Sequence, residues 1–465
     1  MLSPTRMHYA MRDNSSSRHA FGGSAIATAL SQAKGLAAAY GSSTTTAVLA
    51  ALSLTIGIVC NGFDNGFGNP IGLIVNALLL LYLLSLSAPA MSFWIWTGPV
   101  IATTLAGVIW LALPLTSAGR QMGALPLAPD LALSQFLGLA AALIALLSGC
   151  LFGIRHGRAA VIDWLLAFMA ADFLVGLFIW HGDFEGASEL WSMGRHGRFA
   201  ATLGNSNVAA AVSGSVAVLA LARALSTDRD RKRRTNPRRA VAWRVFHWLV
   251  LLLALGACAA TASRAAMALT LAAMLVLGGR TVLFSRVRGR AMLVFAATAI
   301  VVATILLAGY SDQLMERSRA LSADSLDRLA MWTHAADLVW ASPLFGYGTG
   351  SFPALNLYAL ADPRMAGAMW TINSPHCILL RLALDGGLPY LVLVLCGVAW
   401  VGVSCLLAFG PRRWDTLSIG LALAVGVIIG CAMVDIALDV PAVSTLMLFL
   451  VGLIWGRARS FSLSL

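Results

Sequence analysis

Residues 387–409 read GLPYLVLVLCGVAWVGVSCLLAF, a run of 23 residues without a charged side chain. As an α-helix the run would rise about 34 Å, enough to cross a bilayer core of roughly 30 Å. Similar apolar runs occur at 44–60, 70–87, 91–114, 131–152, 159–180, 206–225, 241–260, 265–279, 291–309, 416–435 and 440–456. The sequence therefore predicts twelve membrane-spanning helices.

The composition of the whole chain agrees with this prediction. Of its 465 residues 59% are apolar and 11% charged, and the mean hydropathy is +0.81. Soluble domains have about 45–50% apolar and about 25% charged residues, so the excess apolar surface must face lipid. These values exclude a disordered chain, a disulfide scaffold, a nucleic-acid module and a single-span anchor. The predicted fold class is an all-α, polytopic transmembrane helical bundle.

The basic residues predict how the bundle is oriented. The formal net charge is +12, which in a soluble protein would suggest a nucleic-acid partner. Here, with the N-terminus inside, 23 of the 32 basic residues fall in predicted cytoplasmic segments, where the positive-inside rule places them. We therefore expect cytoplasmic termini and no nucleic-acid partner. The basic run 228–239 is interpreted as a topology determinant.

The runs also divide the chain into four parts. Residues 1–43 form a polar cytoplasmic tail, 44–309 hold spans one to nine, 310–386 form a long periplasmic loop, and 387–465 hold the last three spans and a short tail. Within the loop we expect an amphipathic helix from Ser325 to Trp340, with Asp324 as its N-cap. The glycine-rich stretch 343–350 then ends this helix.

Three residues on the non-cytoplasmic side are candidates for catalysis. Arg264 lies in a tight turn between two spans, Arg328 in the first turn of the loop helix, and His376 where the loop re-enters the membrane. Arginine suits bidentate phosphate recognition, a helix N-terminus favours an anion, and histidine is a general base near neutral pH. Structural roles stay open for each: an interfacial arginine, an exposed ion pair of Arg328 with Asp324, and a structural histidine.

Other patterns are interpreted as structural. Gly346, Gly348 and Gly350 predict turns rather than a phosphate loop, because no Gly-Lys-Ser/Thr follows them. Residues 204–207 fit a loop and helix cap. Without an acidic cluster at metal-ligand spacing on that side, we expect a metal-free site and no cofactor. The seven cysteines lie within or beside apolar runs, so we expect small buried hydrophobes: Cys60, Cys150, Cys258, Cys377, Cys396, Cys405 and Cys431.

Taken in order, several motifs resemble those of the O-antigen ligase family. They are R-F-A-A-T-L-G-N-S-N (198–207), T-A-S-R (261–264), S-L-D-R-L-A-M-W (325–332), S-P-L-F-G-Y-G-T-G (342–350), N-S-P-H (373–376) and L-D-G-G-L (384–388). The resemblance implies catalytic roles for His376, Arg264 and Arg328. It also implies substrate-binding roles, for Arg198, Asn205, Asn207, Ser263 and Trp332.

The resemblance further implies a bacterial inner-membrane glycosyltransferase whose site faces the periplasm. Such an enzyme transfers a glycan from undecaprenyl diphosphate to a hydroxyl acceptor, with inversion and without a metal ion. Arg264 and Arg328 would bind the diphosphate, and His376 would deprotonate the acceptor.

The family resemblance leaves the acceptor open. Lipid A–core would make the protein an O-antigen ligase, which we expect first. A second lipid-linked repeat would make it an O-antigen or exopolysaccharide polymerase, and a pilin Ser or Thr a protein glycosyltransferase. A lipid-linked glycan transporter is the alternative of another class. Transporters carry ionisable residues near the midplane of their spans, whereas here the unusual charges concentrate outside.

Overall fold

The computed structural model describes residues 43–60, 62, 68–86, 89–124, 126–182, 198–226, 237–284, 321–359, 372–409 and 414–462. Residues 43–47 belong to a first unit, Met1–Ala47, and the other described residues to a second, Val48–Leu465. Within the described ranges the chain forms helices and no strand. The expected all-α polytopic fold is thereby confirmed.

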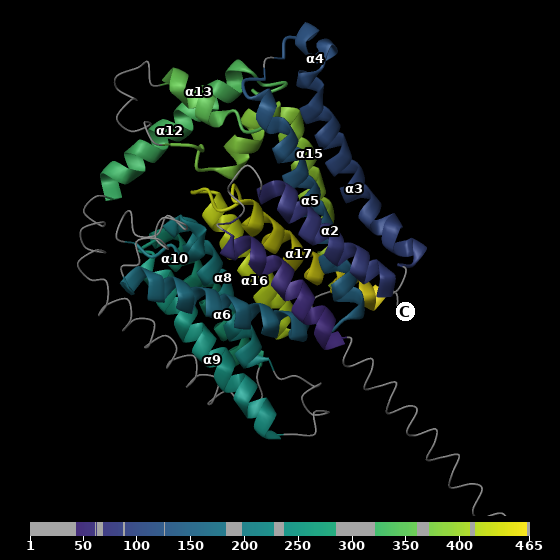
Figure 1. Cartoon of the computed structure of the whole chain (residues 1–465), viewed down its shortest axis with the longest axis vertical. Coiled ribbons are helices and arrows are strands. Elements are labelled where there is room, and N and C mark those ends of the chain that lie inside the picture. Colours follow the sequence, from purple (N-terminus) through teal and green to yellow (C-terminus); the bar gives the residue numbers. More distant parts are fainter. Residues whose placement is uncertain are drawn as a thin grey trace, which may run out of the picture. The chain divides into compact units, whose positions relative to one another are not determined.

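After the apolar helix Ser43–Val59, the second unit contains the following helices (Figure 1). They are α2 (Gly68–Leu86), α3 (Met91–Ala112), η2 (Leu113–Leu115), α4 (Ser117–Gln121), η3 (Pro129–Leu131), α5 (Ala132–Arg155), α6 (Arg158–Gly182), η4 (Ala201–Leu203), α8 (Ser206–Leu225), α9 (Pro237–Ala260), α10 (Arg264–Phe284), α12 (Leu321–Ala341), α13 (Phe352–Ala359), α15 (Ile378–Phe409), α16 (Thr416–Ala432) and α17 (Pro441–Ser462).

The helices coincide with the predicted spans wherever the chain is described. Nine are long and apolar enough to cross a membrane, and Ser43–Val59 and Thr416–Ala432 are shorter apolar helices at two further predicted runs. The predicted span 291–309 lies outside the described residues. So do four of the basic residues on the predicted non-cytoplasmic side: Arg195, Arg317, Arg319 and Arg364. The protein is therefore a multi-pass membrane protein.

The bundle is organised around α8, whose residues from Val208 to Ala224 are all buried. Helices α6, α9, α10 and α16 pack against it, while α5 packs on α2 and α17. Gly149 and Gly153 let α5 approach α17 closely, because a Cβ at Gly149 would lie 2.2 Å from the Phe449 carbonyl oxygen. Small residues four apart are how membrane helices reach such contacts.

Two charge clusters join helices at the end of α8 near Leu225. The carboxylate of Asp163 accepts hydrogen bonds from Arg223 at 2.7 and 3.0 Å and lies 2.7 Å from the His247 ring, and all three side chains are buried. Arg158 pairs with Asp415 at 2.8 Å. The two arginines thus each pair with a carboxylate, as buried charges must.

The loop helix α12 differs from its expected start. It spans Leu321–Ala341, so Asp324 lies inside the helix and is not its N-cap, and Arg328 lies about two turns in. Leu and Ala favour helix, and a single Asp is a weak start signal against them. The dipole argument for an anion at Arg328 therefore fails, since that effect is confined to the first turn.

The loop segment 343–350 packs tightly on α15. This helix begins at Ile378 and has non-helical dihedrals at Gly386 and Gly387. Residues 343–350 pair with this kink: the Tyr347 N–H donates to Leu384 O at 2.7 Å and the Leu388 N–H to Pro343 O at 2.8 Å. A Cβ at Gly387 would lie 2.2 Å from the Leu344 carbonyl oxygen. Residues 343–350 and 384–388 thus form one backbone contact, which we call the glycine clasp. The predicted turn role of Gly346, Gly348 and Gly350 is confirmed.

The cysteines agree in part with expectation. All seven are free thiols. Four are buried: Cys150, Cys258, Cys405 and Cys431. Cys60 and Cys396 are exposed, so the prediction of burial was wrong for them. Cys396 lies on a membrane-spanning helix, where an exposed apolar side chain faces lipid rather than protein.

Candidate functional site

The turn between α9 and α10 places Arg264 at the start of α10. The Thr261 hydroxyl oxygen accepts from the Ser263 N–H at 3.2 Å, and Ala262 adopts a left-handed φ of +50°. The Ser263 carbonyl then accepts from the Met267 N–H at 3.1 Å, which begins the helix. The T-A-S-R motif therefore has a local role, which is to start α10 at Arg264.

Asn205 is the N-cap of α8. Its side-chain oxygen accepts from the backbone N–H groups of Asn207 and Val208, at 2.9 and 3.2 Å. Gly204 precedes it with a φ of +65° and ends the short helix η4. This geometry confirms the helix-cap interpretation of residues 204–207, and it directs the Asn207 side chain away from the cap.

Arg198 links this cap to the α9–α10 turn. Its Nε donates to the Thr261 carbonyl at 2.7 Å, and its Nη2 donates to the Asn207 side-chain oxygen at 2.8 Å. Two motifs that are separate in sequence are thus joined through one guanidinium group.

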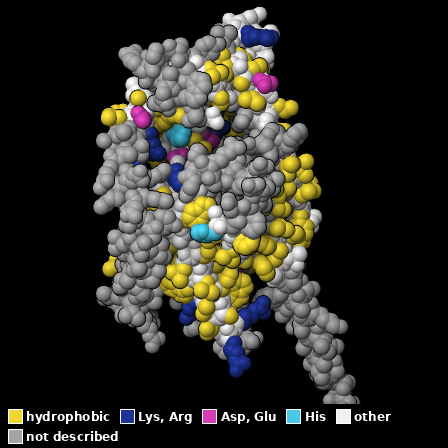
Figure 2. All heavy atoms as spheres, turned by 60° about the vertical axis from the view of Figure 1, so that its left-hand side comes forward, with side chains coloured by type: hydrophobic (Ala, Val, Ile, Leu, Met, Phe, Trp, Pro, Cys, Tyr) yellow, Lys and Arg dark blue, Asp and Glu magenta, His cyan; other side chains and the backbone are white. Residues whose placement is uncertain are grey.

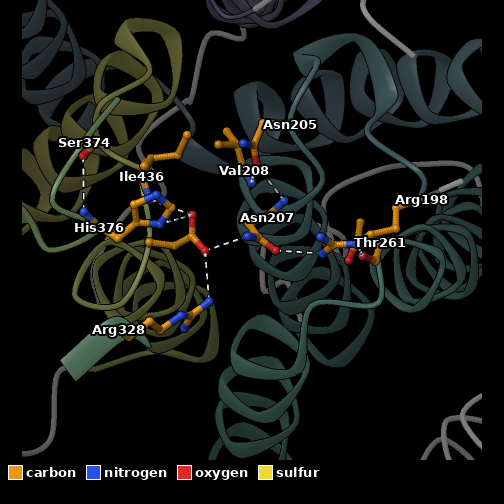
Figure 3. Close-up of polar contacts among 10 residues, drawn as sticks. Arg198, Asn205, Asn207, Val208, Thr261, Arg328, Ser374, His376 and Ile436 are labelled. Carbon is orange, nitrogen blue, oxygen red and sulfur yellow. Dashed lines mark hydrogen bonds and ion pairs between the residues drawn. The ribbon is translucent and has the colours of Figure 1, made fainter. Parts of the chain in front are cut away.

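Asp435 connects these motifs with the loop residues. It follows α16 and is buried. Its Oδ2 accepts from Asn207 Nδ2 at 2.6 Å and lies 3.7 Å from Arg328 Nη2, while its Oδ1 lies 3.6 Å from His376 Nδ1. Figure 3 shows the contacts running from His376 to Asn207 and on to Arg198 and Thr261, with Arg328 reaching in from α12.

These side chains border a cavity of about 490 Å³. Basic, acidic and histidine side chains gather in a hollow of this face, above a broad apolar surface (Figure 2). Its lining comes from five places in the chain and comprises Arg198, Asn207, Ser263, Arg264, Ala265, Asp327, Arg328, Met331, Ile372, His376, Cys431, Val434 and Asp435.

Six of the eight predicted site residues line this cavity: Arg198, Asn207, Ser263, Arg264, Arg328 and His376. The other two do not. Asn205 serves as the helix cap described above. On α12 the cavity is lined by Asp327, Arg328 and Met331, and the half-buried Trp332 is not among the lining residues.

Sequence reasoning missed Asp435 as a site residue. Its signal is the stretch V-D-I-A-L-D-V at 434–440, which has one acid at the end of the predicted span 416–435 and a second before the next span. Alternation of the spans puts this stretch on the same side as Arg264 and His376, but only the packed structure brings it to them.

His376 adopts a left-handed φ of +51°, which is uncommon outside glycine. Burial is the largest effect on the imidazole and lowers its pKa, and Arg328 lowers it further, whereas Asp435 and Asp439 raise it. The net result is a pKa below the ordinary value of histidine. The ring is therefore neutral at pH 7. Because Nδ1 is the atom near Asp435, Nε2 is the nitrogen left for a substrate in the cavity.

In the ranges that the structure describes, no three His, Cys, Asp or Glu side chains are grouped to hold a metal ion. The positive charges at the cavity come instead from arginines. Arg264 begins α10, and the side chain of Arg328 is 41% exposed beside Asp435. Such an arrangement can bind a polyanion and can accept a proton at His376.

Comparison with known proteins identifies part of the chain. Residues 249–395 match the family model described as O-Antigen ligase, which confirms the resemblance drawn from the motifs. The matched range contains Arg264, Arg328 and His376, while Arg198, Asn207 and Asp435 lie outside it. No curated protein matches the chain at a significant level.

Proposed function

We propose that the protein transfers a glycan from undecaprenyl diphosphate to a hydroxyl acceptor at the periplasmic face of the bacterial inner membrane. The proposal follows from the match of residues 249–395 to the O-antigen ligase family model. The reaction is inverting and metal-independent. The observation that carries the proposal is the cavity of about 490 Å³ that Arg264, Arg328 and His376 line together.

The arginines act on the leaving group. As the bond between the anomeric carbon and the diphosphate oxygen breaks, negative charge builds on the diphosphate. Arg264 and Arg328 stabilise that charge, the role that metal ions have in other phosphate chemistry. A diphosphate leaves without protonation, so no general acid is needed. Arg198, held by Thr261 and Asn207, keeps the α9–α10 turn in place beneath Arg264.

His376 acts on the nucleophile. The acceptor oxygen forms its bond to the anomeric carbon from the face opposite the diphosphate, and its proton passes to Nε2 of His376. Asp435 lies 3.6 Å from Nδ1 and stabilises the imidazolium that results. Asp435 also lies close to Arg328, so the base and the diphosphate-binding group share one carboxylate.

The acceptor defines the biological role. We propose lipid A–core, which makes the protein an O-antigen ligase. A polymerase would use a second lipid-linked repeat in the same cavity, and a protein glycosyltransferase a Ser or Thr hydroxyl. The three products differ in mass and in the molecule that carries the glycan, so product analysis distinguishes them.

The proposal is tested with purified protein in lipid nanodiscs. The donor is undecaprenyl-diphosphate-linked glycan from membranes of the producing cell, and the acceptor is lipid A–core from a strain that lacks O-antigen. We expect glycosylated lipid A–core and released undecaprenyl diphosphate, at the same rate with and without EDTA. A rate that disappears with EDTA and returns with a divalent cation would contradict the metal-independent mechanism.

The transporter alternative is decided by the same material in sealed proteoliposomes. A transporter would move the intact lipid-linked glycan to the other leaflet and leave its diphosphate bond unbroken. The buried ion pair of Arg223 with Asp163 does not favour this alternative, because Arg223 lies near the end of α8 and Asp163 near the start of α6, and the two groups neutralise each other.

We expect an acid limb in the pH dependence of transfer with a midpoint below about 6.5, the ordinary pKa of histidine. The base must be neutral, so activity is present above the lowered pKa of His376 and is lost as the pH falls through it. Asp435→Asn removes a charge that raises this pKa, and the midpoint should move lower. Arg328→Gln removes a charge that lowers it, and the midpoint should move higher.

The measurement is kcat against pH at saturating donor for the three proteins. The charged groups around His376 are Asp435 and Asp439 of the α16–α17 connection and Arg328 of α12, with Asp327 and Arg264 lining the same cavity. Shifts of both variants in the same direction would rule out His376 as the titrating group.

A further inference from the structure

The connection between α16 and α17 carries a second carboxylate that the mechanism does not use. Asp439 lies four residues after Asp435, and its Oδ2 accepts a hydrogen bond from the Ser374 hydroxyl. Its Oδ1 forms an ion pair with Nη1 of Arg381. The two acids of this connection thus contact the same loop segment. Asp435 lies near the ring of His376, and Asp439 bonds to Ser374, two residues before His376.

Ser374 passes this contact on to the backbone of His376. The Ser374 oxygen accepts from the His376 N–H at 3.4 Å, while its own hydrogen is donated to Asp439. The residue between them is Pro375, whose ring fixes its φ. The left-handed φ of +51° at His376 therefore follows a segment that is restrained at both preceding residues.

Arg381 anchors Asp439 to the rest of the fold. It lies in the first part of α15, and its Nε is also 3.6 Å from Oδ2 of Asp385. Asp385 Oδ1 in turn accepts from the Gly350 N–H at 3.3 Å, within the glycine clasp. The chain of contacts from His376 thus ends on the backbone pairing between the loop and the kink of α15.

We propose that Asp439 and Ser374 are positioning residues, which hold the main chain of His376 in its left-handed conformation so that Nδ1 faces Asp435 and Nε2 faces the cavity. The inference rests on the proposed function, in which His376 is the base. Neither residue is among those that line the cavity. Their effect passes through the direction of the imidazole ring.

The positioning role makes a prediction that a general structural role does not. The diphosphate is bound by Arg264 and Arg328, which lie on α10 and α12, whereas Ser374 and Asp439 bond to each other and Asp439 pairs with Arg381 of α15. Loss of the positioning contact should therefore lower kcat and leave the donor KM unchanged. A displacement of about 1 Å at a reacting group can cost about 10²-fold in rate.

The experiment compares Ser374→Ala, Ser374→Thr and Asp439→Asn in the nanodisc assay. We expect Ser374→Ala and Asp439→Asn to lower kcat by about 10²-fold, with the donor KM within about a factor of two of the parent. Ser374→Thr keeps the hydroxyl and should retain most of kcat. The matched control is Ser404→Ala, which removes another buried hydroxyl that accepts from two side chains, Trp455 and Arg459, on α17.

Each outcome decides one question. If His376→Ala is inactive while Ser374→Ala and Asp439→Asn keep the parent kcat, the positioning role is overturned and the proposed function stands. If His376→Ala keeps its activity, the assignment of His376 as the base fails and the positioning role fails with it, and if the parent protein transfers no glycan, the proposed function itself fails. If Ser374→Ala does not purify as a folded protein, Asp439→Asn, which keeps the side-chain shape, gives the same test. Equal losses in Ser374→Ala, Ser374→Thr and Ser404→Ala would overturn positioning in favour of a general packing effect.

Discussion

Replacing His376 with alanine is expected to lower kcat for glycan transfer by about 10²–10⁴-fold, the usual contribution of a general base. The nearest carboxylate, Asp435, already accepts from Asn207 and lies close to Arg328. Donor binding should persist, because the arginines that hold the diphosphate are unchanged.

The measurement is single-turnover transfer in nanodiscs together with binding of undecaprenyl diphosphate. His334→Ala is the matched control, since His334 is also a loop histidine but does not line the cavity. Parent-like rates in His376→Ala would exclude His376 as the base. Loss of undecaprenyl diphosphate binding in that variant would instead indicate that the residue holds the donor.

Alanine at Arg264 or Arg328 is expected to lower kcat by about 10²–10³-fold, as for the loss of one group that stabilises transition-state charge. Lysine at either position should give an intermediate rate, because it keeps the charge but lacks the planar fork that binds two phosphate oxygens.

Arg120→Ala is the control for the arginine variants, because Arg120 is an exposed arginine of α4 that does not line the cavity. Rates and donor KM are measured for the parent and all five variants at one ionic strength, since exposed charges are screened by salt. Unchanged kcat in both alanine variants would contradict the proposed leaving-group role.

The helices of the bundle could be predicted because their cause is local. A charge-free apolar run long enough to cross a bilayer has few alternatives to an α-helix, since every backbone polar group must be satisfied within it. The same holds for Asn205, whose cap bonds reach only the next three residues. The kink of α15 was not predicted, because it depends on carbonyl groups of residues 343 and 344 as well as on Gly386 and Gly387.

The site could be predicted in its residues but not in its assembly. Two arginines, Arg264 and Arg328, stood out because basic residues on the non-cytoplasmic side oppose the positive-inside trend. His376 stood out because it adjoins a predicted span. Asp435 meets Asn207 across 228 positions of sequence, and no local pattern specifies that contact. Trp332 shows the opposite error, because a motif gives all its residues equal weight although only some of them line the cavity.

The order in which the chain is made gives Asp435 a further consequence. Ribosomes synthesise the segments with Arg264, Arg328 and His376 before the connection between α16 and α17, which enters the membrane after them. Since Asp435 contacts Asn207, Arg328 and His376, the residues before it cannot form the complete constellation. A nascent or truncated chain that ends before residue 435 should thus leave the pool of lipid-linked glycan untouched.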